Sequence, residues 1–176
     1  ARVLLLDKSR SAGGRMATRW MEEAEGGRAY FDHGAQFFTV RDGAFQRLVD
    51  EWTSAGLVRE WCKGFGPEQT DGHPRYVGVG GMNSIARHLA RDHEVVTGTV
   101  VSRVFRSSRT WHIETDTGSE YSARSVVLTA PLPQALGLLG ELAPGIATEV
   151  GTIDYDPCLA LLLRLTGPSA IPEPGG

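Results

Sequence analysis

At 176 residues, the chain is long enough for one domain with its own core, or for a large part of a bigger domain. Its composition is that of an ordinary globular protein, and its net charge of -3 gives no basic field for nucleic acid or an anionic membrane. Two cysteines far apart in sequence fit neither a disulfide framework nor a zinc site, and no leader or membrane-length apolar run is visible, which together predict a cytoplasmic protein.

The first element is an apolar run, "VLLL", that ends in Asp7 and predicts a fully buried strand over residues 3–7. In a dinucleotide-binding fold, the acid that ends the second strand binds a ribose and follows the glycine motif by about 20 residues. Only six residues precede Asp7, so we expect the first strand and the glycine loop to lie upstream of residue 1. The alternative is an ordinary aspartate in a turn.

The segment "SAGGRM" follows Asp7 and predicts a tight turn. Paired glycines let the backbone approach a phosphate, and Arg15 directly after them supplies a forked, permanently charged donor for pyrophosphate oxygens. A surface turn with a solvated arginine is the alternative for this segment taken alone. Its place eight residues after Asp7 favours the cofactor interpretation.

Extended segments are expected between residues 16 and 40, followed by two helices. The first helix, over 42–56, has Asp42 as its cap, Gly56 at its end and an apolar face; the second, over 80–92, places Met82, Ile85 and Leu89 on one face. A short strand and a loop are expected between the two helices.

After the second helix, "EVVTG" predicts a strand, and three further strands follow at hairpin spacing, "VVSRVFR", "TWHIETD" and "SEYSA". "SVVLTAP" then predicts another buried strand. A three-stranded antiparallel meander that leads back into a buried strand is typical of a flavin-type variant of the doubly wound fold. The predicted fold class is therefore α/β: a Rossmann-like FAD-binding domain with a meander, incomplete at both ends.

Residues 30–39, "YFDHGAQFFT", place Asp32, His33 and Gln36 among aromatic and small residues, as a slot for a flavin ring requires. His33 has the right chemistry for an acid or base at neutral pH, but a lone histidine is more often structural. No nucleophile elbow, zinc-protease motif or paired C-x-x-C occurs, so hydrolase and metal chemistry are not expected, and no catalytic residue is identified.

With these residues in view, the chain resembles the renalase-type members of the flavin amine oxidase family. The resemblance covers most of the chain and rests on "VLLLDKSRSAGGRMATRW", "FDHGAQFFTVRD", "RYVGVGGMNSIARHLA" and "SVVLTAPLPQA", in the family's order and at its approximate spacing. It implies an FAD-dependent oxidase whose flavin accepts a hydride and passes it to oxygen, with isomeric forms of NAD(P)H as substrates.

The resemblance also implies roles for particular residues. It places Asp7 and Lys8 at the adenosine ribose, Val101 at the adenine, and Arg15 with Met16 at the pyrophosphate and the ring end of FAD. Beside the isoalloxazine ring it places a further set of residues, Gly34, Ala35 and Gln36. The expected partner is a small-molecule substrate, with no nucleic acid and no membrane.

Segments of two domains are expected to alternate along the chain. Residues 1–40 and 79–135 are assigned to the FAD-binding domain, the second range with the meander, while 41–78 begins a substrate-domain insertion and 136–176 a further, truncated one. Two other functions stay open from the sequence: a flavin amine oxidase or desaturase with another substrate, and a non-catalytic fragment that holds no FAD.

Overall fold

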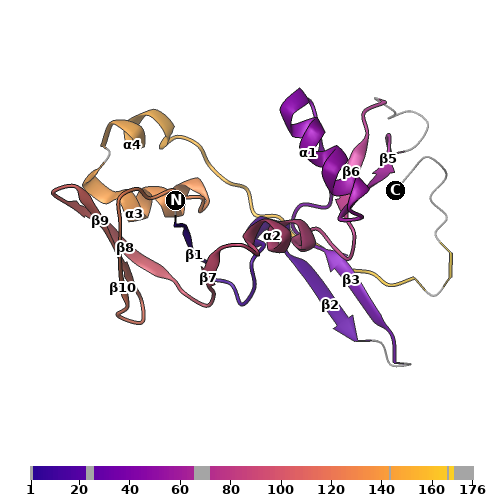
Figure 1. Ribbon diagram of the computed structural model, residues 1–176, viewed down its shortest axis with the longest axis horizontal. Helices are drawn as coiled ribbons and strands as arrows, with labels where there is room; N and C mark the ends of the chain where they lie inside the picture. Colours follow the sequence, from indigo (N-terminus) through magenta and orange to yellow (C-terminus); the bar gives the residue numbers. More distant parts are fainter. Residues whose placement is uncertain (1, 23–25, 66–71, 143, 166, 169–176) are drawn as a thin grey trace. The chain divides into compact units, whose positions relative to one another are not determined.

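The structure is a computed structural model that describes residues 2–22, 26–65, 72–142, 144–165 and 167–168 (Figure 1). The chain forms two compact units. The meander unit consists of Ala1–Ser11 and Val95–Leu159, and the pocket unit consists of Ala12–Glu94 and Ala160–Gly176. Both combine helices with antiparallel strands, so the expected mixed α/β class is confirmed at this coarser level.

The meander unit is built on three antiparallel strands in the order β10-β9-β8 (Figure 1): β8 Val101–Ser107, β9 Thr110–Thr115 and β10 Glu120–Ala123. Val104 of β8 and Tyr121 of β10 both pair with Ile113 of β9, and Val104 and Ile113 are buried. The alternation of apolar and polar residues thus turns one sheet face inward. The predicted meander is confirmed.

The strand predicted at residues 3–7 is present but is not fully buried. It is β1 Leu4–Leu6, which is half-buried and pairs with β7 Glu94–Val96. In the described part of the chain, β7 is the one strand beside it, whereas cover on both faces of a buried strand requires a wider sheet with helices on each side. The expectation of full burial is therefore wrong in this structure.

The strand predicted at "SVVLTAP" is not formed. Residues 125–129 carry no ladder hydrogen bonds, and Val127 is 84% exposed. An extended apolar run becomes a strand only where a neighbour pairs with its backbone, and the described residues offer this segment none. After it come three helices: α3 Leu132–Leu139, which lies against β8, η2 Gly140–Leu142 and α4 Pro144–Val150.

The pocket unit holds two antiparallel sheets (Figure 1). One pairs β2 Thr18–Glu22 with β3 Arg28–Asp32; the other has the order β4-β6-β5, with β4 Phe38–Thr39, β5 Val58–Cys62 and β6 Arg75–Gly78. The extended segments predicted before residue 40 are therefore confirmed. The core of the unit consists of five buried residues from α1, β5, the turn before α2 and α2 itself: Val49, Trp52, Val58, Met82 and Ile85.

Helix α1 Gly43–Ser54 begins and ends as its sequence predicts. The Asp42 carboxylate accepts hydrogen bonds from the backbone N–H groups of Ala44 and Phe45, each at 2.9 Å, which caps the helix. Gly56 follows the helix at φ 71°, a conformation that favours glycine.

Helix α2 Asn83–Ala90 confirms the second predicted helix but not the whole of its predicted face. Met82 and Ile85 are buried, whereas Leu89 is 53% exposed, because the core reaches only the first turn of this short helix. No helix in the described ranges is both long and apolar enough to cross a membrane.

Candidate functional site

Two of the predicted cofactor segments touch each other in the pocket unit. The turn "GGRM" forms the short 3-10 helix η1 Gly14–Met16, and the Ala35 N–H donates a hydrogen bond of 2.8 Å to the Arg15 carbonyl oxygen. A side chain on Gly34 would collide with that same carbonyl. Segments about twenty positions apart in sequence are thus joined backbone to backbone, and the glycine is what permits the close approach.

A third segment, the turn "VGGMN" before α2, packs on the same place. A Cβ on Gly81 would lie 2.5 Å from the Thr18 side chain, and one on Gly13 would lie 3.1 Å from the Cβ of Asn83. Gly13 and Gly81 also have φ values of 146° and 105°, which side chains rarely adopt. The glycines of the three segments therefore allow close packing around η1 and the start of β2.

A hydrogen-bond network centred on Asp32 holds the same three segments. Asp32 Oδ1 accepts from Thr18 Oγ1 at 2.5 Å and from the Met82 N–H at 2.9 Å, while Thr18 Oγ1 accepts from the Asn83 N–H at 3.1 Å. Helix α2 has no cap from its own N-cap residue, so Asp32 and Thr18 satisfy N–H groups that would otherwise be orphaned. One carboxylate thus fixes the end of β3 to the start of α2.

Arg15 and Met16, which are neighbours in η1, have different surroundings where the three segments meet. Arg15 is exposed and makes no ion pair with any residue in the described ranges, while Met16 packs on the core. Beside Arg15, Gly14 has a φ of 48° and open space where a Cβ would be. A free guanidinium next to an unobstructed glycine backbone is chemistry that fits a pyrophosphate, so these residues fit a dinucleotide cofactor.

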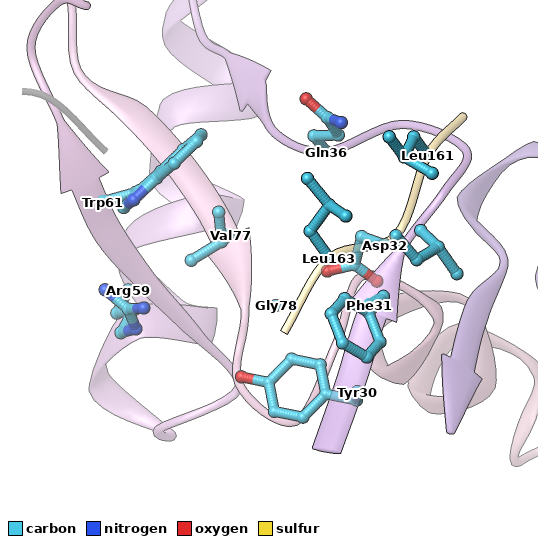
Figure 2. Close-up of a pocket in the computed structure, with 11 residues that line it drawn as sticks. Tyr30, Phe31, Asp32, Gln36, Arg59, Trp61, Val77, Gly78, Leu161 and Leu163 are labelled. Atoms are coloured by element: carbon cyan, nitrogen blue, oxygen red, sulfur yellow. The ribbon is translucent and has the colours of Figure 1, made fainter. Parts of the chain in front are cut away.

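A pocket of about 450 Å³ opens beside this junction (Figure 2). Its polar lining comes from Asp32, Gln36 and Arg59, and its aromatic lining from Tyr30, Phe31 and Trp61. The remaining wall is formed by Val77, Gly78, Leu161, Leu162 and Leu163. The volume lies within the range of small-molecule sites, and the lining combines polar groups with aromatic and aliphatic walls.

Sequence reasoning found only part of this pocket. Gln36 was predicted beside the ring, and Asp32 and Tyr30 lie in the segment that was singled out, but Arg59 and Trp61 were missed. These two residues lie two positions apart on β5, which pairs with β6, and β6 supplies Val77 and Gly78 to the same pocket. The sequence predicts a short strand in this region, but its apolar and polar residues do not alternate, so it gives no sign of which side chains face the pocket.

The other predicted residues, Asp7, Lys8 and Val101, lie in the meander unit. The Thr99 N–H donates to the Asp7 carbonyl oxygen at 3.0 Å, so the chain that leads into Val101 starts beside Asp7. Lys8 is exposed, and Val101 is half-buried at the start of β8. Asp7 Oδ1 accepts from the Ser9 N–H at 2.8 Å, a local turn of the kind that the sequence left as the alternative. Asp7 Oδ2 has no partner among the described residues.

Two further groups add little to the site. His33 is exposed and has no hydrogen-bond partner in the described ranges, so it keeps no orienting group for acid–base work. The described residues contain no group of three or more His, Cys, Asp or Glu side chains suited to a metal ion. Both cysteines are free, Cys62 buried and Cys158 exposed.

Comparison with known proteins identifies a matching family and a curated relative. The family described as flavin containing amine oxidoreductase matches residues 65–173, more than half of the chain. Renalase from Mus musculus is 28% identical over 144 residues, which cover 78% of this chain and 42% of that protein. The chain therefore spans less than half the length of this curated relative.

Proposed function

Because the chain belongs to the flavin-containing amine oxidoreductase family and is renalase-like, we propose that it forms part of an FAD-dependent oxidase. When bound, FAD supplies a ring that takes up a hydride from the substrate and passes two electrons to oxygen, giving hydrogen peroxide. The proposed substrate is a nicotinamide dinucleotide in an isomeric reduced form, or an amine.

The observation that carries this proposal is the contact between the turn "GGRM", which holds Arg15, and the segment of Gly34 and Ala35. Gly34 and Ala35 abut the Arg15 backbone, so a ligand that meets the exposed Arg15 guanidinium by its phosphates can reach Gly34, Ala35 and Gln36 with its ring end. Arg15 would donate to pyrophosphate oxygens, and Met16, anchored in the core, would keep η1 in place beneath them.

In the meander unit, Asp7 would bind the adenosine half. Its Oδ2 would accept from ribose hydroxyls while its Oδ1 stays in the local turn with Ser9, and Lys8 and the Val101 backbone would complete the contacts to ribose and adenine. We also propose that β1 and β7 belong to a doubly wound sheet. The domain boundaries at residues 40, 78 and 135, which separate the FAD-binding segments from the substrate-domain segments, are part of the same proposal.

The purified protein, reconstituted with FAD, tests this function. We expect flavin absorbance to bleach anaerobically with isomeric dihydronicotinamide dinucleotides faster than with ordinary NADH, and hydrogen peroxide to appear on readmission of air. Faster bleaching by a primary amine would replace the substrate with an amine and keep the oxidase. Bleaching by none of these compounds would refute the oxidase itself.

A further inference from the structure

We propose that Asp32 is a specificity-determining residue that accepts a hydrogen bond from an N–H beside a carbonyl, in the ring or in an amide attached to it, of a flat ligand in the pocket; this inference rests on the proposed flavin-dependent function. Asp32 lines the pocket, where Figure 2 draws it between Phe31 and Leu163. Its Oδ1 already accepts two hydrogen bonds, from Thr18 and Met82. Its Oδ2 accepts none from the described part of the chain, so that oxygen is left for a ligand.

The orientation of this carboxylate is over-determined by its partners. The Met82 N–H can only donate, and the Thr18 hydroxyl, which receives the Asn83 N–H, has its single proton left for Asp32. Both partners therefore require an acceptor at Oδ1. The register of the hairpin, which pairs Thr18 with Asp32, keeps the two side chains opposite each other. The pocket consequently meets a fixed acceptor rather than a mobile one.

The rest of the pocket indicates which ligand would use that acceptor. Tyr30, Phe31 and Trp61 offer aromatic surfaces for a flat ring (Figure 2). Gln36 offers an amide that can donate to a carbonyl, while Asp32 accepts from an N–H. The complementary chemistry is a flat heteroaromatic group that carries an N–H next to a carbonyl.

Two molecules expected in such an oxidase carry that edge. The flavin ring has an imide N–H between two carbonyls, and the nicotinamide of a dinucleotide has a carboxamide. Both are probed without their phosphates, so that binding at Arg15 makes no contribution: lumiflavin against 3-methyl-lumiflavin, and nicotinamide against N,N-dimethylnicotinamide. In each pair the second compound lacks the N–H and keeps the ring.

The test combines these probes with Asp32→Asn. Because Met82 and Thr18 both require an acceptor, the new amide must place its oxygen on them and its NH₂ in the pocket, which reverses the pocket-facing group from acceptor to donor. We expect wild-type protein to bind one N–H probe about tenfold or more tighter than its methylated partner, and Asp32→Asn to abolish that preference. Whichever pair shows the preference identifies the source of the ring.

Two control variants separate this role from a structural one. Thr18→Val removes a hydrogen bond to Asp32 without touching the pocket lining, so it should lower stability and leave the N–H preference intact. Asp92→Asn makes the same carboxylate-to-amide change at an exposed site outside the pocket and should change neither property. Far-UV circular dichroism checks that every variant is folded.

Three results would overturn the inference. They are equal binding of both members of each pair by wild-type protein, no binding of any probe, and a preference that survives in folded Asp32→Asn. None of them decides the proposed function, which is judged by binding and reduction of intact FAD. Loss of FAD reduction with the N–H preference retained would refute the function and leave the pocket assignment standing as a ring-binding site.

Discussion

Replacement of Gly34 by alanine tests the junction on which the site is built. The added methyl group would overlap the Arg15 carbonyl oxygen and would lie 3.3 Å from the Ala17 nitrogen, so the backbone of one segment must move. Overpacking of this kind costs about 1–3 kcal/mol. Movement would also stretch the 2.8 Å hydrogen bond from Ala35 to Arg15, which is worth about 1 kcal/mol. We therefore expect a loss of about 2–4 kcal/mol in the free energy of unfolding.

Urea unfolding followed by tryptophan fluorescence measures this loss. The matched control is Gly43→Ala at the start of α1, where a Cβ would meet no atom within 4 Å and φ is ordinary; there we expect no loss, or a gain of about 0.5–1 kcal/mol from helix propensity. An unchanged midpoint for Gly34→Ala would refute the close approach of the two segments. A loss of unfolding free energy in both variants would mean that the pocket unit tolerates no added methyl group at either glycine, whatever the local contacts.

Other variants test the cofactor contact and the two features of the core. Arg15→Ala should weaken FAD binding about tenfold, measured by flavin fluorescence quenching, and added salt should reduce the difference from wild-type protein. The control Arg91→Ala, at another exposed arginine, should leave FAD affinity unchanged. Equal loss of affinity in both variants would contradict a specific phosphate contact. Asp42→Ala should cost about 1 kcal/mol of unfolding free energy through the lost cap of α1, and an unchanged urea midpoint would argue against the cap. Val49→Ala, at a side chain with no exposed surface, should cost about 2–3 kcal/mol, while Val127→Ala, 84% exposed, should stay within about 0.5 kcal/mol; similar values for the two would contradict their assigned burial.

The elements that the sequence predicts well are those whose signals are local. The cap at Asp42 and the glycine at Gly56 bracket α1 because capping and positive φ depend on the few residues around them. The meander follows from alternation and short turns, and its strands pair with their neighbours in the chain. The turns at the glycine segments belong to the same class.

The predictions that failed depended on neighbours that sequence periodicity cannot identify. Val127 lies in an apolar run as strong as that of β1, yet no described strand pairs with it. Leu89 continues the helical repeat of Ile85 but extends past the core. In the site, Asp32 was visible as a polar residue among aromatics, whereas its link to Met82, fifty positions away, comes from the fold alone.

The most direct test of the cofactor assignment compares FAD with FMN on wild-type protein and on Asp7→Asn. FMN carries the ring and one phosphate but no adenosine, so only FAD can use Asp7. The variant can keep its turn with Ser9 while presenting an amide in place of Oδ2. We predict tighter binding of FAD than of FMN by wild-type protein, and loss of that advantage in Asp7→Asn with FMN affinity unchanged. Equal affinity for both flavins, or an FAD advantage that survives the substitution, would contradict it.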